Sequence, residues 1–183
     1  MSQSQKMRAA LHQYVISGLL ERGFQGTYPD FRKVYDERIE LIVFQSNKWG
    51  NSFTVEISTV YPNRDKRHSN VAGYVYEHPD FSWDWITVGD TNERYRLKGR
   101  FDGWFYYTDV YRHGTRSPFA RVEDRWFWYE AVGEKRAATF KPTKDMALVQ
   151  KADDKIYERV CKDVNRQMKA AYKWWKRMSR HGI

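Results

Sequence analysis

The last forty residues carry the pattern that most restricts how this chain can fold, a single apolar stripe at helical spacing. Apolar side chains recur there every three or four residues, at Ile156, Val160, Val164, Met168, Ala171, Tyr172 and Trp175. This period predicts an amphipathic helix over about 153–180. A helix with one apolar face is stable when another layer of the protein covers that face. The preceding residues therefore have to provide such a layer.

The N-terminus predicts a second helix, and the residues after it predict strands. Ser2 and Gln5 have the spacing of a capping box, and Gly23 stands where a left-handed residue commonly ends a helix. From there the apolar period changes from 3.6 to 2, which is typical of strands. We expect strands over 31–35, 38–45, 52–61, 71–76, 93–101, 104–111 and 126–132. The second and third flank a short turn that contains Asn and Gly, which predicts a β-hairpin.

Length and composition favour one folded domain. The 183 residues include 17% aromatic side chains, and neither a Pro/Gly/Ser-rich linker nor an internal repeat interrupts them. We therefore expect a single α+β domain over 1–183. Its antiparallel β-sheet has about five to seven strands and is flanked by an N-terminal helix and a long C-terminal helix. Because no apolar run has the length of a signal peptide or a membrane span, we expect a cytoplasmic protein without stable membrane insertion.

The predicted hairpin also carries a recognisable motif. Residues 44–55 read FQSNKWGNSFTV, and the helix before them ends in Gly23-Phe24. This arrangement, over about 11–61, resembles the bacterial family of domains of unknown function numbered 4304 (DUF4304). The resemblance implies an α+β fold and a bacterial, cytoplasmic protein, and it implies no reaction. Its signature positions would be Gln45, Lys48 and Trp49, whose alternative role is to fix the hairpin turn.

The sequence offers no catalytic set. Its single cysteine, Cys161, falls beside the apolar stripe of the C-terminal helix, where a free cysteine behaves as a small hydrophobe. The five histidines are scattered, and no Gly-rich phosphate loop precedes a Lys-Ser/Thr pair. We therefore expect no catalytic residue, no metal site and no cofactor. A nuclease-like enzyme with an unfamiliar site stays open as an alternative, and the first residues to test for it are His78, Asp80, Asp84 and Asp90.

Two segments concentrate the positive charge of a chain whose formal net charge is +9. In the first, four cations alternate with apolar residues and would share one face of a strand, at Arg94, Arg96, Lys98 and Arg100. Acids on neighbouring strands, such as Glu56 or Asp109, could instead neutralise that face. The second segment, 166–183, has six Lys/Arg residues and no acid. Its candidate anion contacts are Lys169, Lys173, Lys176, Arg177 and Arg180, with Trp174 off the stripe and placed to stack on a base.

These features predict a non-enzymatic protein that binds an anionic partner, with nucleic acid as the first choice. The basic strand face and the basic helix would contact phosphates, which position a nucleic acid without reading its sequence. The excess of aromatic residues without a catalytic set leaves one alternative of another kind. This is an interaction factor, immunity or defence-associated, that binds an acidic protein.

Overall fold

The computed structural model describes residues 1–48, 50, 52–64, 69–76, 81–99, 103–107 and 155–181. Over these residues an antiparallel sheet of six strands forms the centre of the fold. The strands are β1 (Gln25–Thr27), β2 (Asp30–Val34), β3 (Ile39–Ser46), β4 (Ser52–Val60), β5 (Tyr95–Arg96) and β6 (Phe105–Tyr106). They pair in the order β1-β2-β3-β4-β5, and β6 also pairs with β4. The expected α+β class and antiparallel sheet are confirmed.

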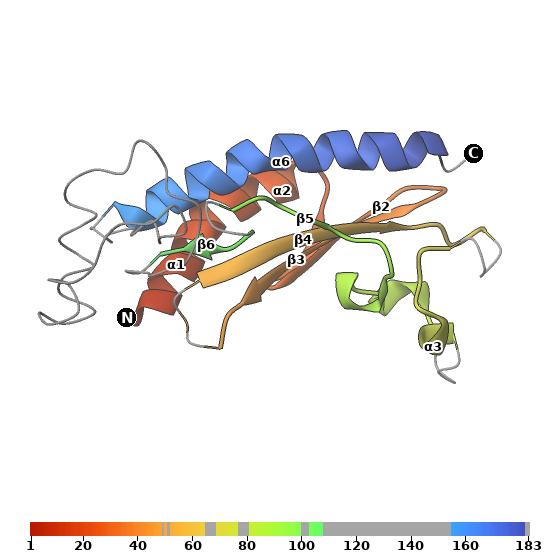
Figure 1. The fold of residues 1–183 in the computed structure, drawn as a ribbon, viewed down its shortest axis with the longest axis horizontal. Helices are drawn as coiled ribbons and strands as arrows, with labels where there is room; N and C mark the ends of the chain where they lie inside the picture. The colour runs from red at the N-terminus through yellow and green to blue at the C-terminus, as the bar shows by residue number, and fades with distance from the viewer. Residues whose placement is uncertain are drawn as a thin grey trace, which may run out of the picture.

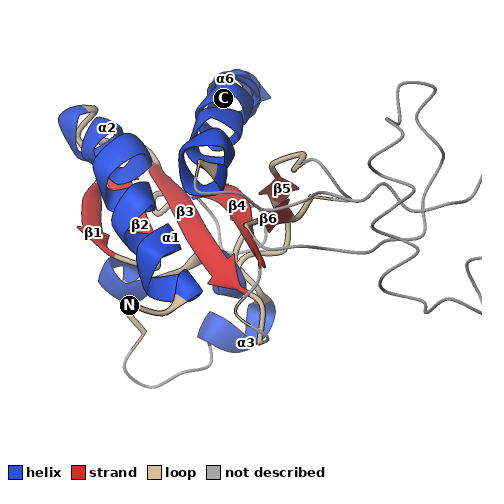
Figure 2. Ribbon diagram, turned by 90° about the vertical axis from the view of Figure 1, so that its left-hand side faces the viewer, coloured by secondary structure: helices blue, strands red, loops and turns tan. Residues whose placement is uncertain are grey.

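Helices from both ends of the chain pack on one face of this sheet. The N-terminal helix runs through α1 (Gln3–Leu11), a π-helical turn η1 (His12–Ile16) and α2 (Ser17–Glu21), and the C-terminal helix is α6 (Ile156–His181). α6 extends along the long axis of the molecule above the sheet (Figure 1). Figure 2 shows α1, α2 and α6 on one side and the short α3 (Gly73–Tyr76) on the other. Both predicted terminal helices are therefore present.

Local sequence signals explain where the N-terminal helix begins and ends. The Ser2 hydroxyl accepts a hydrogen bond from the Gln5 backbone N–H, and the Gln5 side chain accepts one from the Ser2 backbone N–H. This capping box satisfies two donors that a helix start otherwise leaves open. After α2, Gly23 adopts φ +86°, a left-handed conformation that glycine reaches without strain. The predicted start and stop of this helix are confirmed.

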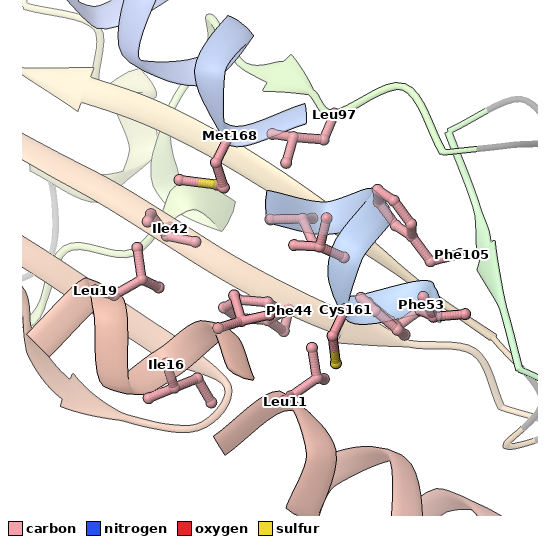
Figure 3. Close-up of a cluster of buried hydrophobic side chains, with 14 of the residues drawn as sticks. Leu11, Ile16, Leu19, Ile42, Phe44, Phe53, Leu97, Phe105, Cys161 and Met168 are labelled. Carbon is pink, nitrogen blue, oxygen red and sulfur yellow. The ribbon is translucent and has the colours of Figure 1, made fainter. Parts of the chain in front are cut away.

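The main hydrophobic core lies between the sheet and the helices. Val55 and Ile57 of β4 point from the sheet toward Val164 and Met168 of α6, and all four are buried. Cys161 is completely buried in this core, with its sulfur pointing toward Leu11 of α1 (Figure 3). Burial raises the pKa of the Cys161 thiol to about 12, and nearby Glu158 adds to the shift. The thiol is therefore protonated and inert at neutral pH, as its position beside the apolar stripe predicts.

A second, smaller core covers the opposite face of the sheet. Alternate residues of β3 and one residue of β4 meet residues 71–76 and 81–90, which contain α3, η2 (Trp83–Trp85) and η3 (Val88–Asp90). The buried members are Ile39, Leu41, Val43, Val60, Val71, Ala72, Val75, Ile86 and Val88. Because both faces are covered, β4 is buried along its whole length. The apolar character of both faces of β3 has the same origin.

Several strand predictions need correction. The predicted strand 71–76 is wrong, because only Val71 forms a β-bridge, to Thr91, and the residues after it form the helical turn α3. Within the predicted strand 93–101, the structure forms only the two-residue strand β5. The predicted strand 104–111 is described as far as residue 107, and β6 lies within that part. The predicted strand 126–132 lies outside the described residues. β1 is a strand that the sequence pattern did not predict.

Candidate functional site

The exposed side of α6 is a continuous line of cations. Seven exposed Lys/Arg side chains follow one another at spacings of three or four residues, with one adjacent pair at the end of the line. This basic ridge consists of Arg159, Lys162, Arg166, Lys169, Lys173, Lys176 and Arg177. Residues at such spacings lie above one another on one face of a helix. At 1.5 Å per residue the ridge is about 27 Å long.

The two halves of the basic ridge differ in their acidic neighbours. In the first half, Lys162 pairs with Glu158 at 2.6 Å and Arg166 pairs with Asp163. The hydrogen bond between the first two raises the pKa of Lys162 and lowers that of Glu158. In the second half, from Lys169 onward, no carboxylate of the described residues forms an ion pair with a ridge cation. The unneutralised charge is therefore concentrated toward the C-terminal end.

Hydrogen bonds to β4, to Tyr61 and to the N-terminal helix fix α6 in place with the basic ridge facing outward. The indole N–H of Trp175 donates to the Ser58 carbonyl of β4 at 2.9 Å. The Tyr61 hydroxyl donates to the Met178 carbonyl at 2.8 Å, and burial raises its pKa. Near the other end, the Asn165 amide donates to the Tyr14 carbonyl in η1 at 2.7 Å. A cationic surface that is already ordered loses little conformational entropy when it binds.

The arginines of the predicted basic strand are paired with a buried acid. The Glu56 side chain accepts from Arg96 Nε at 2.8 Å and pairs with Arg94 at 3.8 Å. Glu56 is only 5% exposed and lies directly opposite Arg96 in the β4–β5 register. Glu56 therefore pairs with both arginines, as that alternative expected, and its single charge offsets one of their two. Asp109, the other acid considered, lies outside the described residues.

The paired arginines and the basic ridge lie on opposite faces of the sheet. Val55 and Ile57 of β4 face α6, and Glu56 between them must point to the other face, because successive side chains in a strand alternate. Arg96, which bonds to Glu56, points the same way. Tyr95 beside it faces α6 and stacks on Trp174 at 6.2 Å. Arg94 and Arg96 therefore do not extend the surface formed by the helix.

Lys98 behaves differently from these two arginines. β5 ends at Arg96, and the chain then turns with a hydrogen bond from the Gly99 N–H to the Leu97 carbonyl at 3.0 Å. Beyond that turn, Lys98 lines a half-open cavity of about 870 Å³ together with Arg159 and Arg166 of the basic ridge. The expected fourth cation of the strand, Arg100, lies outside the described residues, as does the side chain of Arg180.

Among the candidates that the structure describes, Trp174 is the one that is buried. Its side chain is 8% exposed and belongs to the main core, where it stacks on Tyr95. The prediction that it lies off the apolar stripe is wrong, because α6 packs on the sheet and also against the N-terminal helix beside it. A helix with neighbours on two sides buries a wider arc than a seven-residue stripe suggests. Trp174 has no free ring face for a base.

The family-signature turn has the geometry of a hairpin. Gln45 is the exposed penultimate residue of β3, and Lys48 is exposed in the turn, while Trp49 lies outside the described residues. Asn47 N–H donates to the Ser52 carbonyl at 2.9 Å, and Gly50 takes φ +65°. The predicted hairpin is confirmed.

The acids proposed for an alternative enzyme belong to the capping hydrogen bonds of short helical turns where they are described. Ser82 caps η2, where its hydroxyl accepts from the Asp84 backbone N–H at 3.2 Å and donates to the Asp84 carboxylate at 3.4 Å. Asp90 accepts from the Thr87 N–H at 2.9 Å in a capping box of η3. His78 and Asp80 lie outside the described residues. Over the part of the chain that is described, no three His, Cys, Asp or Glu side chains gather in a way that could hold a metal ion.

The sequence pattern missed the first half of the basic ridge. Arg159 and Lys162 precede the acid-free segment that drew attention to the tail, and they have acidic neighbours in sequence, since Glu158 precedes Arg159 and Asp163 follows Lys162. The signal was nevertheless present, because these cations continue the same three- and four-residue spacing. In the structure the exposed cations form one line, with the two acids beside it.

Comparison with known proteins gives a family and no function. A family model described as a domain of unknown function, DUF4304, matches residues 16–109, about half of the chain. The match includes the hairpin motif at 44–55 that carries the resemblance. No curated protein and no solved structure matches the chain. Among the described helices, none combines the length and the apolar character needed to cross a membrane.

Proposed function

The chain belongs to the DUF4304 family of domains of unknown function, and we propose a function from its own surface: it binds the phosphate backbone of nucleic acid along the basic ridge of α6. The observation that carries this proposal is the line of seven exposed cations, four of them without an acidic partner among the described residues. Contacts of this kind position a nucleic acid and read no base sequence.

The charge density of the basic ridge fits a nucleic-acid strand. Its length of about 27 Å corresponds to roughly eight phosphates along one strand, at 3.4 Å of helix axis for each phosphate. Seven cations over that length come close to one for each phosphate. A ligand whose negative charges are spaced regularly over this distance can therefore contact the whole ridge at once.

Electrostatic repulsion within the basic ridge supports an anionic partner. Like charges at i, i+3 and i, i+4 positions destabilise a helix by a few tenths of a kcal/mol each. The favourable interaction of cations with the helix dipole is confined to the last turn, so it leaves Lys169 and Lys173 unexplained. Binding of a polyanion turns this repulsion into attraction and releases counterions from the polymer.

Arg94 and Arg96 are not part of this proposal. Both are occupied by Glu56, and both lie on the face of the sheet away from α6. This separation gives a direct experiment, because charge can be removed from either face independently.

We would measure the binding of labelled single- and double-stranded oligonucleotides of mixed sequence by fluorescence anisotropy. Lys173→Gln removes one ridge cation. The matched control is the triple variant Glu56→Gln, Arg94→Gln, Arg96→Gln, which also lowers the net charge by one but leaves α6 unchanged. We expect Lys173→Gln to weaken binding and to lower the slope of log K against log salt by about 0.7–0.9. The control should match the wild-type protein.

Two results would contradict the proposal. One is the absence of binding to either oligonucleotide at low salt, where phosphate contacts are strongest. The other is equal loss of affinity in both variants, which would indicate a general effect of net charge. Polyglutamate serves as a competitor, because displacement of the oligonucleotide at equal charge concentration would favour an acidic protein as the partner.

A further inference from the structure

A cleft lies at the C-terminal end of the basic ridge, between α6 and the hairpin that joins β2 to β3. Figure 1 shows this hairpin beneath the C-terminal half of α6. The cleft has a volume of about 420 Å³ and is half open to solvent. Small-molecule sites commonly have volumes of this order. Four cations line it, and they come from three separate parts of the chain: Arg22, Lys33, Arg38 and Lys176.

One acid lines the cleft, and both of its carboxylate oxygens already accept hydrogen bonds. Glu40 is buried, and its Oε1 accepts two hydrogen bonds from the Arg38 guanidinium, both at 3.2 Å. Its Oε2 accepts from the Tyr35 hydroxyl at 3.1 Å. Glu40 therefore neutralises Arg38 and holds it in place. It also fixes Tyr35, over whose ring the Arg38 guanidinium lies at 3.9 Å.

The other three cations of the cleft have no carboxylate partner among the described residues. Lys33 donates to the Arg22 carbonyl at 2.6 Å, which leaves two of its three donors for a ligand. The Arg22 guanidinium lies over the Tyr172 ring at 5.0 Å. Lys176 is also a member of the basic ridge and is exposed. Three cations that converge on one cavity repel each other unless an anion is bound between them.

Aromatic rings form the floor of the cleft. Trp175 is buried there, with Phe24 at 5.6 Å and Tyr172 at 5.8 Å between ring centroids. Phe24 and Trp175 are buried, so Tyr172, which is only partly buried and has the Arg22 guanidinium over its ring, is the aromatic side chain that a ligand in the cavity can reach. Cationic walls above an aromatic floor suit a ligand that joins a phosphate to a planar ring.

We propose that this cleft binds a nucleotide with a terminal phosphate, with the phosphate against Arg22, Lys33 and Lys176 and the base beside the partly exposed Tyr172. A phosphomonoester carries about −1.5 to −2 charges at neutral pH, against −1 for a phosphate within a strand, so it suits three cations better. Because Lys176 belongs to both surfaces, the terminal nucleotide of a strand bound along the basic ridge reaches the cleft. Binding of a strand end in the cleft rests on the proposed function. Binding of a free nucleotide does not, because a free nucleotide presents the same terminal phosphate and base.

The test compares short single-stranded oligonucleotides that end in a phosphate or in a hydroxyl, with adenosine monophosphate and adenosine as free-ligand probes. Lys33→Met and Arg22→Gln remove cleft cations outside the basic ridge, and circular dichroism verifies that each variant is folded. Lys169→Gln with Lys173→Gln is the control that changes the ridge alone. Each oligonucleotide is titrated against every variant by anisotropy, and the free ligands are titrated by calorimetry.

We expect the phosphorylated oligonucleotide to bind the wild-type protein about fivefold more tightly at low salt, the gain from one added phosphate contact. Both cleft variants should lose this preference and keep their affinity for the hydroxyl-ended strand. The ridge control should weaken both strands and retain the preference. Equal binding of the two strands, together with no binding of adenosine monophosphate, would overturn the cleft and leave the proposed function standing. If no strand binds but adenosine monophosphate binds and Lys33→Met abolishes this, the proposed function fails and the cleft is a site for free nucleotides.

Discussion

Substituting Glu56 with Gln removes the acid that holds Arg94 and Arg96 on the sheet face away from α6. Glu56 is buried, and Arg96 places two donors on its Oε1, at 2.5 and 2.8 Å. Exposed ion pairs contribute about 0.2–1 kcal/mol, and hydrogen bonds to charged groups about 1.5–3 kcal/mol. The Arg96 side chain is 47% exposed, so we expect an intermediate loss of about 1–2 kcal/mol in the free energy of unfolding.

Thermal and urea unfolding of Glu56→Gln, Arg96→Gln and the double variant measure this loss. For a chain of this size about 1–2 kcal/mol corresponds to a decrease in Tm of roughly 2–8 °C. The double-mutant cycle should give a coupling energy of about the same 1–2 kcal/mol, because the two side chains contact each other directly. A coupling energy near zero, or an unchanged Tm in both single variants, would refute the assigned ion pair.

Glu56→Gln also shows, in a binding assay, whether nucleic acid binds the sheet face that carries Arg94 and Arg96 or the basic ridge of α6. Glu56→Gln and Glu158→Gln each raise the net charge by one, but only Glu158 pairs with a cation of the basic ridge, Lys162. We expect Glu158→Gln to increase nucleic-acid affinity and the salt slope, since it frees one cation for a phosphate contact. Glu56→Gln should leave both unchanged. Higher affinity for Glu56→Gln and unchanged affinity for Glu158→Gln would assign binding to the sheet face that carries Arg94 and Arg96.

Three further predictions concern buried groups. Cys161 should not react with a thiol reagent in the native protein and should react on unfolding, because burial raises its pKa to about 12. Trp175→Phe should lower the free energy of unfolding by about 1–3 kcal/mol in urea titrations, since the buried Ser58 carbonyl loses its indole donor. Burial and the nearby Asp90 raise the pKa of Asp30, so the folded state binds this proton more tightly than the unfolded state and loses stability as the pH rises above about 3.8. Asp30→Asn should therefore raise Tm at pH 7, and this gain should disappear at pH 3. A gain that is equal at both pH values would contradict the shift.

Local patterns of the sequence were sufficient for the elements that depend on local chemistry. The capping box at Ser2, the β3–β4 hairpin and α6 each follow from spacing within a single segment. The prediction of a strand at 71–76 was wrong for a physical reason. Val71 and Val75 are four positions apart in the sequence. An apolar pair at that spacing fits one side of a strand and one turn of a helix equally well. Tertiary packing decided between them, and it gave α3.

The candidate binding surface depended on information that a single segment does not contain. The neutralisation of Arg96 requires the register between β4 and β5, which joins residues 40 positions apart. The burial of Trp174 requires Tyr95 to lie beneath α6. The cleft at the end of the basic ridge combines Arg22, the β2–β3 hairpin and α6, and no sequence motif unites these. Only the cations of the basic ridge could have been found from helical spacing alone.

The salt dependence of nucleic-acid binding tests the central claim most directly, in the wild-type protein and in a variant that neutralises the acid-free half of the basic ridge. This variant carries four substitutions: Lys169→Gln, Lys173→Gln, Lys176→Gln and Arg177→Gln. If all four cations contact phosphates, the slope of log K against log salt should be smaller than that of the wild-type protein by about 3, at about 0.7–0.9 for each contact. An identical slope for the two proteins would contradict binding along α6.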